Sequence, residues 1–243
     1  MKLLRISWRF LFFVAYTASI VVTIYTRKVV LKKDIHDAMR IRRRWARRLL
    51  RGVGVLIESS GEVIDQPCLL VCNHRSYLDP IIILAFQDAF PVAKAELANW
   101  PLLGKGARLA GILYLRRESA NSRASILREI ASAIEAGHQV LLFPEGTTSG
   151  IVDGLLPFKK GGFRAAAEHR LAVSPVALCF ASPEDFWVGE EGFLEHAYRR
   201  FQEKTIRVKV HFGPVYRDAD ASVLHDNCKN WIEQRLAAHW NRH

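Results

Sequence analysis

The stretch CLLVCNHRSYLDP, residues 68–80, joins a short apolar run to a group of polar residues. The apolar run at 68–72 has the length and composition of a buried β-strand. Polar residues follow it at once, and Pro80 after Asp79 favours the first turn of a helix. A strand that passes through a polar turn into a helix is typical of α/β proteins, which place their functional sites at such strand ends.

The same alternation of short apolar runs with helical patterns continues from residue 52 to the C-terminus. Predicted strands lie at 53–58, 68–72, 90–93, 112–115, 139–143, 173–180 and 206–212. Predicted helices lie at 78–87, 101–110, 122–136, 163–170 and 223–240. This order predicts an α/β fold with a mixed, largely parallel sheet flanked by helices, which occupies residues 52–243. Residues 1–51 form a membrane-anchoring segment in this interpretation, with an apolar helix followed by a basic amphipathic helix.

The chain has 243 residues, of which 50% are hydrophobic and 24% are charged, enough for one sizeable domain with a short appendage. Its four cysteines are too few and too scattered for a disulfide framework or a zinc site, so we expect a reducing compartment. The net charge of +11 is concentrated in residues 1–51, which hold 14 Lys and Arg. Nucleic-acid enzymes spread their basic surface through the fold, so we expect no nucleic-acid partner. A basic segment beside an apolar one favours an anionic membrane surface.

Residues 10–25, FLFFVAYTASIVVTIY, form a run without a charge. As a helix the run would span about 24 Å, whereas the hydrocarbon core of a bilayer is about 30 Å thick. Basic residues flank it on both sides, which suits a segment that enters and leaves by the same leaflet. We therefore predict a membrane anchor or a re-entrant helix. The alternatives are a signal peptide, although no small-x-small cleavage site follows the run, and a buried core helix.

Residues 35–51 carry seven arginines from Arg40 onward, and Ile41, Trp45 and Leu49 recur on one face of a predicted helix. The favoured interpretation is an interfacial helix, with Trp45 at the depth of the lipid headgroups and arginines on lipid phosphates. The alternative is a solvated helix that packs on the domain by its single apolar stripe.

Three predicted strand ends carry side chains with catalytic chemistry. His74 and Asp79 are five residues apart, so a turn can bring the carboxylate onto one ring nitrogen of the histidine. This pair is the base and the orienting acid of a catalytic triad, although Asp79 alternatively caps the helix that follows it. The second strand end carries Glu145 and the third carries Arg117, for which a capping acid and a surface arginine are the alternatives. The chain lacks the Gly-x-Ser-x-Gly motif of a nucleophilic serine, so we expect the nucleophile on the substrate.

Over roughly residues 50–215 the chain resembles the glycerolipid acyltransferases of the lysophosphatidic acid acyltransferase family, in which N-terminal membrane helices are also typical. Four blocks occur in the family's order: Asn73-His74-Arg75-Ser76-Tyr77-Leu78-Asp79, Gly111-x-x-Tyr114-x-x-Arg117, Phe143-Pro144-Glu145-Gly146-Thr147 and Val173-Ser174-Pro175-Val176. Two more stretches are similar to the family: Lys94-Ala95-Glu96-Leu97 and Pro157-Phe158-Lys159-x-Gly161.

The resemblance implies a membrane-associated acyltransferase at the cytoplasmic face of the inner or plasma membrane. It would move a fatty acyl group from an acyl thioester, on coenzyme A or acyl carrier protein, to the free hydroxyl of a lysophospholipid. The first candidate acceptor is 1-acyl-glycerol-3-phosphate, which gives phosphatidic acid. His74 would take the hydroxyl proton while Asp79 holds the imidazole. Lys94 and backbone amides would stabilise the oxyanion, although Lys94 could instead form an ion pair with Glu96.

The resemblance also implies how the acceptor is held. Arg117, Glu145, Gly146 and Thr147 would contact its phosphate and glycerol, and we expect no metal and no cofactor besides the acyl donor. Many members of the family have an arginine where this chain has Thr148, which removes one phosphate-binding cation.

The missing arginine leaves the acceptor open. Lys159, Lys160 or Arg116 would compensate for it, or the acceptor is another lysolipid, such as a lyso-ornithine lipid. A non-catalytic lipid-binding protein on the same fold is the alternative from another functional class, and a hydrolase that uses water as acceptor is a third.

Overall fold

A computed structural model describes residues 2–99, 109–115 and 120–241 and places the strands in one sheet of seven, in the order β1-β7-β6-β2-β5-β3-β4. The strands are β1 Val55–Ser60, β2 Leu69–Cys72, β3 Ala89–Lys94, β4 Leu113–Leu115, β5 Gln139–Leu142, β6 Val173–Phe180 and β7 Ile206–Phe212. All neighbouring strands are parallel except β6 and β7, which are antiparallel. The mixed, largely parallel α/β sheet predicted from the sequence is therefore confirmed.

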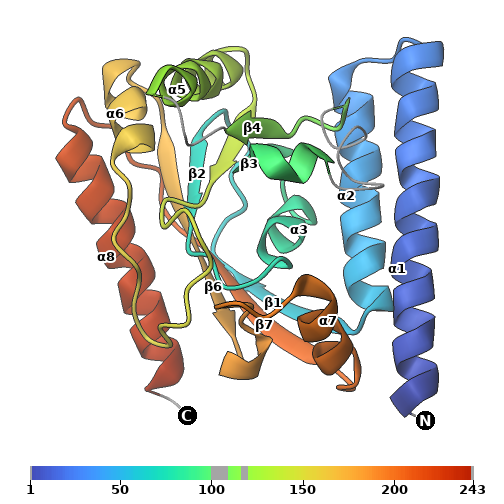
Figure 1. The fold of residues 1–243 in the computed structure, drawn as a ribbon. Helices are drawn as coiled ribbons and strands as arrows, with labels where there is room; N and C mark the ends of the chain where they lie inside the picture. The colour runs from blue at the N-terminus through green and yellow to red at the C-terminus, as the bar shows by residue number, and fades with distance from the viewer. Residues whose placement is uncertain (1, 100–108, 116–119, 242–243) are drawn as a thin grey trace.

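Helices cover both faces of this sheet (Figure 1). They are α1 Lys2–Tyr25, α2 Ile35–Gly52, α3 Asp79–Leu84, α5 Ala120–Glu135, α6 Gly161–Glu168, α7 Phe193–Phe201 and α8 Ala221–Trp240. Strand β2 shows why the central strands are continuous apolar runs. Leu70 packs with α2 and α3 on one face, whereas Leu69 and Val71 pack with α5, α6 and α8 on the other. A strand buried on both faces has no solvent side on which to place polar residues.

The seven predicted strands all exist, and their ends differ from the prediction by no more than two residues. The predicted helix at 78–87 is shorter than expected, and the one at 101–110 lies almost wholly outside the described residues. Helix α7 was not predicted. Its apolar positions Phe193, Ala197 and Phe201 recur every four residues, but the segment is short and otherwise polar.

Helices α1 and α2 lie side by side, joined by a π-helical turn at Thr26–Val30 (Figure 1). The apolar stripe of α2 faces inward: Trp45 is only 9% exposed, its Nε1–H donates to Thr17 Oγ1 at 3.3 Å, and Leu49 belongs to the core beside the sheet. Arg42 is also buried and donates to the carbonyls of Ala89 and Ala110. The prediction that Trp45 lies at headgroup depth is wrong, because its indole fills the space between α1 and the domain.

One face of α1 packs on the domain along the length of the helix, and the opposite face is apolar and exposed. Arg9 is buried near one end, and Ile24 is buried near the other. Exposed apolar residues at helical spacing line the other face: Leu4, Trp8, Leu11, Val22 and Tyr25. Within the described residues, the helical stretch Lys2–Val30 is long and apolar enough to cross a membrane, judged by length and composition alone. The buried-core alternative is wrong for most of this stretch, because only 17% of its apolar window is buried.

Candidate active site

The site lies at the C-terminal edge of the parallel strands, where β2 and β5 are neighbours. The turn after β2 carries His74, and the turn after β5 carries Glu145. The two turns are joined through the backbone of His74: its N–H donates to the side-chain oxygen Oε1 of Glu145 at 2.8 Å, and its carbonyl accepts from the N–H of Ser149 at 2.9 Å. Parallel pairing of β2 with β5 thus brings together motifs that are 71 residues apart.

Asn73 fixes the start of the first turn. Its side-chain amide donates to the carbonyl of Leu178 at 2.9 Å and accepts from the N–H of Leu178 at 2.8 Å. Strand β2 ends at Cys72. The buried side chain of Asn73 then makes the pair of hydrogen bonds to β6 that the backbone of one more β2 residue would make. An asparagine is suited to this position because its amide offers both a donor and an acceptor.

His74 and Asp79 form the predicted pair, with 2.8 Å between His74 Nδ1 and Asp79 Oδ2. Asp79 is completely buried, and the same oxygen accepts from the backbone N–H groups of Arg75 and Ser76. A carboxylate accepts hydrogen bonds, so Nδ1 carries the proton and Nε2 is the basic nitrogen. The capping alternative is wrong, because the Asp79 carboxylate turns back to residues 75 and 76 and not toward the helix that follows.

The imidazole of His74 is held by its neighbours but remains accessible. The ring stacks on Phe143, with 4.2 Å between ring centroids and 22° between the planes. Its side chain keeps 21% of its surface exposed, against 0% for the Asp79 side chain. One nitrogen is thus fixed by a buried acid while the ring can be reached by a substrate.

Glu145 has a different role from the one expected. Its side chain is wholly buried, Oε1 accepts from the N–H of His74, and Oε2 accepts from the N–H of Leu156 at 2.9 Å. Burial raises the pKa of Glu145 even though the guanidinium of Arg75, at 3.4 Å, opposes the shift. The expectation that Glu145 contacts the acceptor is therefore wrong: its oxygens are used to tie the His74 turn to the loop around Leu156.

Arg75 supports the same turn and was not identified from the sequence. It is completely buried and donates to Glu145 Oε2 and to the carbonyls of His74 and Gly154. The guanidinium also lies 5.6 Å from the ring centroid of Phe186. Its position next to His74 is the one signal in the sequence, and it does not distinguish a buried arginine from a substrate-binding one.

The turn after β5 reaches the surface at Gly146 and Thr147, as a substrate-binding turn requires. Gly146 has a φ of +75°, a conformation that favours glycine, and a Cβ at this residue would lie only 2.5 Å from Lys159 Nζ. The amine of Lys159 therefore lies over the Gly146 backbone. The side chain of Thr147 is exposed.

Of the other predicted site residues, Lys94 is described and does not contact His74. Lys94 ends β3 at the same edge of the sheet with an exposed side chain, but β5 lies between β3 and β2. Two strand spacings separate Lys94 from the His74 turn by roughly 10 Å. Both Lys94 and Glu96 are described, and no ion pair joins them, so that alternative is wrong. Arg117, like Arg116, lies outside the described residues.

Neither a reactive thiol nor a cluster of metal ligands accompanies the His74–Asp79 pair in the described part of the chain. The four cysteines are buried, and burial raises the pKa of Cys68 and Cys179 to about 12, so neither is a thiolate near neutral pH. The described residues contain no group of three or more His, Cys, Asp or Glu placed to hold a metal ion. Within the described residues, the His74–Asp79 pair is the candidate for proton transfer at this site.

Comparison with known proteins places this chain in one family. A model of the acyltransferase family matches residues 46–179, which is more than half of the chain. The chain belongs to this acyltransferase family.

Its relatives define a narrower group. A lyso-ornithine lipid O-acyltransferase of Pseudomonas aeruginosa is 32% identical over 205 residues, covering 82% of this chain and 79% of the relative. A 1-acyl-sn-glycerol-3-phosphate acyltransferase of Neisseria gonorrhoeae is 33% identical over 180 residues, covering 70% and 68%. The crystal structure of the 1-acyl-sn-glycerophosphate acyltransferase PlsC from Thermotoga maritima has the same fold, with a TM-score of 0.72, 20% identity and 98% of both chains covered. The resemblance to glycerolipid acyltransferases is thereby confirmed.

Proposed function

We propose that this acyltransferase moves a fatty acyl group from an acyl thioester, acyl-CoA or acyl carrier protein, to the free hydroxyl of a lysolipid. The observation that carries the proposal is the His74–Asp79 pair: a partly exposed imidazole with Nδ1 held 2.8 Å from a completely buried carboxylate. This arrangement fixes one tautomer and leaves Nε2 to act as a general base.

In the proposed reaction, Nε2 of His74 takes the proton of the acceptor hydroxyl, and the hydroxyl oxygen attacks the carbonyl carbon of the thioester. The carbonyl oxygen gains a negative charge, for which Lys94 and backbone N–H groups are the candidate partners. The C–S bond then breaks, and the leaving thiolate receives the proton that His74 holds. No acyl-enzyme forms, because the acceptor hydroxyl attacks the thioester directly.

The first candidate acceptor is 1-acyl-glycerol-3-phosphate. Its phosphate would meet the amine of Lys159, which lies over Gly146, and the guanidinium of Arg117. Thr147 and the Gly146 backbone would contact the glycerol.

A lyso-ornithine lipid is the second candidate, because Thr148 stands where many members of the family have a phosphate-binding arginine. The matches to lyso-ornithine lipid O-acyltransferases also cover more of this chain, 82% and 84% for two relatives, against 70% for the N. gonorrhoeae enzyme.

Membrane attachment through α1 is part of the proposal. Because contacts with the domain run from Arg9 to Ile24, a crossing helix would draw the domain into the bilayer. We therefore place α1 flat in one leaflet, with its exposed stripe from Leu4 to Tyr25 among the acyl chains. The exposed Arg40 and Arg44 of α2 would add about 1 kcal/mol each on an anionic, cytoplasmic leaflet.

The test is a transfer assay with full-length protein in vesicles. Acyl-CoA and acyl carrier protein are each offered with 1-acyl-glycerol-3-phosphate, a lyso-ornithine lipid and lysophosphatidylcholine, and the products are identified by mass spectrometry. We expect a diacyl product from at least one acceptor and a loss of roughly 10²–10⁴-fold in rate for His74→Ala. Free fatty acid as the only product would show a hydrolase. Absence of any product, or a His74→Ala rate above a tenth of wild type, would refute the proposal.

A further inference from the structure

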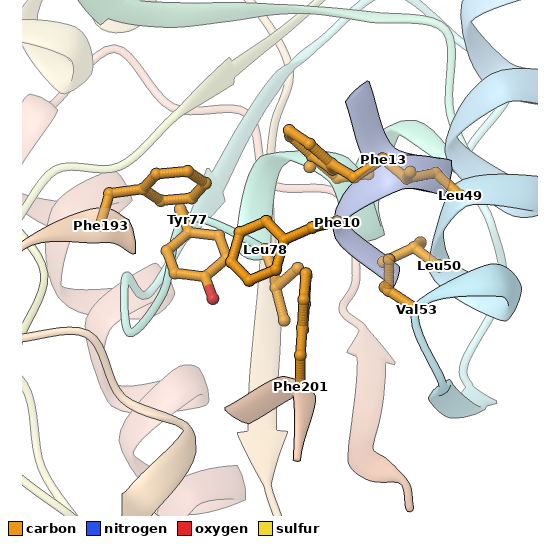
Figure 2. A pocket seen from close by; sticks show the side chains of 10 residues that line it. Phe10, Phe13, Leu49, Leu50, Val53, Tyr77, Leu78, Phe193 and Phe201 are labelled. Atoms are coloured by element: carbon orange, nitrogen blue, oxygen red, sulfur yellow. The ribbon is translucent and has the colours of Figure 1, made fainter. Parts of the chain in front are cut away.

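Tyr77 lies in the turn between His74 and Asp79 and is enclosed by aromatic side chains from a segment that the sequence did not identify. Its ring meets Phe193, His196 and Trp187 edge-on, at centroid distances of 4.8, 5.4 and 5.7 Å. Figure 2 shows the Tyr77 and Phe193 rings side by side at the edge of an apolar pocket. The enclosing residues belong to α7 and to the loop that precedes it.

His196 makes the polar contact in this cluster. It is 1% exposed, with Nε2 at 3.0 Å from the carbonyl of Phe186 and Nδ1 at 3.2 Å from the hydroxyl of Tyr77. A carbonyl only accepts hydrogen bonds, so Nε2 carries the proton and Nδ1 of the neutral ring accepts from Tyr77. Burial lowers the pKa of His196, although Glu191 opposes the shift, and this supports the neutral form.

The loop before α7 holds the catalytic turn at a second point. The backbone N–H of Trp187 donates to the carbonyl of Arg75 at 2.8 Å. This loop is itself fixed to α7, because Arg200 forms a buried ion pair with Asp185, 2.7 Å from Arg200 Nη2 to Asp185 Oδ1. The turn that carries His74 is thus held at residue 75 through its backbone and at residue 77 through its side chain.

The far end of α7 is bound to α1. Arg9 donates to the carbonyl of Phe201, the last residue of α7, at 3.2 Å, and to those of Glu203 and Lys204 just beyond the helix at 2.7 and 2.8 Å. Phe10 meets Phe201 with 5.0 Å between centroids. Helix α7 therefore stands between the N-terminal helix and the catalytic turn, and side chains from all three elements face the pocket in Figure 2.

We propose that His196 is a positioning residue for acyl transfer, which acts through the hydroxyl of Tyr77 to keep His74 aligned with Asp79. The inference rests on the proposed role of His74 as the base. His196 touches neither His74 nor Asp79, but Tyr77 lies three residues after the first and two before the second. A shift of Tyr77 changes the path of the backbone whose N–H groups at residues 75 and 76 bind the Asp79 carboxylate.

The experiment compares four variants in the transfer assay: His196→Leu, His196→Asn, Tyr77→Phe and the double variant Tyr77→Phe/His196→Leu. Leucine removes the acceptor of the Tyr77 hydroxyl, whereas the amide oxygen of asparagine can replace Nδ1. Tyr198→Phe, on the exposed side of the same helix, is the matched control. For each variant we measure kcat, both KM values and the thermal unfolding midpoint, and we assay well below that midpoint.

We expect His196→Leu to lower kcat by roughly 10–100-fold with both KM values nearly unchanged, since a misplacement of about 1 Å can cost about 10²-fold. Tyr77→Phe should do the same, His196→Asn should recover most of the rate, and the double variant should be no slower than His196→Leu alone. Tyr198→Phe should match wild type.

Wild-type kcat in His196→Leu, no recovery in His196→Asn, or additive losses in the double variant would overturn the positioning role. These outcomes are distinct from failure of the proposed function. If the proposed function fails, His74→Ala would keep the wild-type transfer rate in the same assay, whatever the His196 variants show.

Discussion

Replacing Asp79 by asparagine removes one negative charge and little else. The oxygen of the amide can take the place of Asp79 Oδ2, which accepts from His74 Nδ1 and from the N–H groups of Arg75 and Ser76. Because three donors converge on this point, the amide oxygen and not the amide nitrogen should face them. The imidazole should therefore keep its tautomer, and what is lost is the attraction between the carboxylate and the imidazolium formed during the reaction.

The size of that attraction follows from Coulomb's law. Two unit charges about 4 Å apart interact by about 4 kcal/mol at an effective dielectric constant of 20. This energy corresponds to roughly 10³-fold in rate. Since the His74 side chain is 21% exposed, solvent screens part of the attraction. We therefore expect kcat of Asp79→Asn to fall by roughly 10²–10³-fold, with less change in the KM values.

The variant should also be less stable. The second carboxylate oxygen of Asp79, Oδ1, is buried and has no hydrogen-bond partner in the described structure. In Asp79→Asn the amide NH₂ group would occupy this position without an acceptor, at a cost of about 1–3 kcal/mol in the free energy of unfolding. Urea unfolding measures this cost, and Asp226→Asn, on the exposed side of α8, is the matched control. A folded Asp79→Asn protein with more than a tenth of wild-type kcat would refute the orienting role of Asp79.

Three other perturbations have defined outcomes. Burial raises the pKa of Glu145 in the folded protein above its value in the unfolded chain. At pH values above the raised pKa, the buried charge lowers the free energy of unfolding. This loss is recovered as the pH falls through the raised pKa toward the unfolded value. The unfolding free energy of wild type minus that of Glu145→Gln should therefore grow from pH 7 to pH 4.5 in urea titrations; a constant difference would contradict this. Arg117→Ala should raise KM for the acceptor far more than KM for the donor, since a charge-assisted contact is worth about 1.5–3 kcal/mol, and steady-state kinetics with equal changes would move Arg117 away from the acceptor. Deleting residues 1–51 removes the buried Leu49 and Leu50 with the rest of α2, so circular dichroism should show an unfolded or aggregated chain, whereas a cooperative folded domain would show that α2 is dispensable.

The sequence predicted the parts of the molecule that depend on local pattern. Strands such as β6, buried at all eight positions, are almost wholly apolar, and this makes them visible as runs. The pairing of His74 with Asp79 was predictable because five residues are enough for a turn to return on itself.

Other features depend on distant contacts that no local pattern encodes. Glu145 was expected to contact the acceptor, but its oxygens accept from backbone groups of residues 74 and 156, which only the folded sheet brings near. His196 and Tyr77 are 119 residues apart. The apolar stripe of α2 around Trp45 suits a lipid surface and a protein core equally. Only the folded structure shows that it faces the core, where Trp45 also donates to Thr17.

The place of β1 in the sheet determines how late the sheet can be completed while the chain is being synthesised. β1 is an edge strand whose partner is β7, with Val55 beside Ile206, so it stays unpaired until about 150 more residues have been made. At about 5–20 residues per second, this delay is roughly 8–30 s. The hydrogen bonds of Arg9 to the carbonyls of Phe201, Glu203 and Lys204 likewise form only after these residues have been made. During this interval the packed face of α1 has its contacts with α2 but not those with α7 and the residues after it, while its apolar face is open to a lipid surface. With α1 attached to the membrane as proposed, the nascent chain should reach the lipid surface before its sheet is complete.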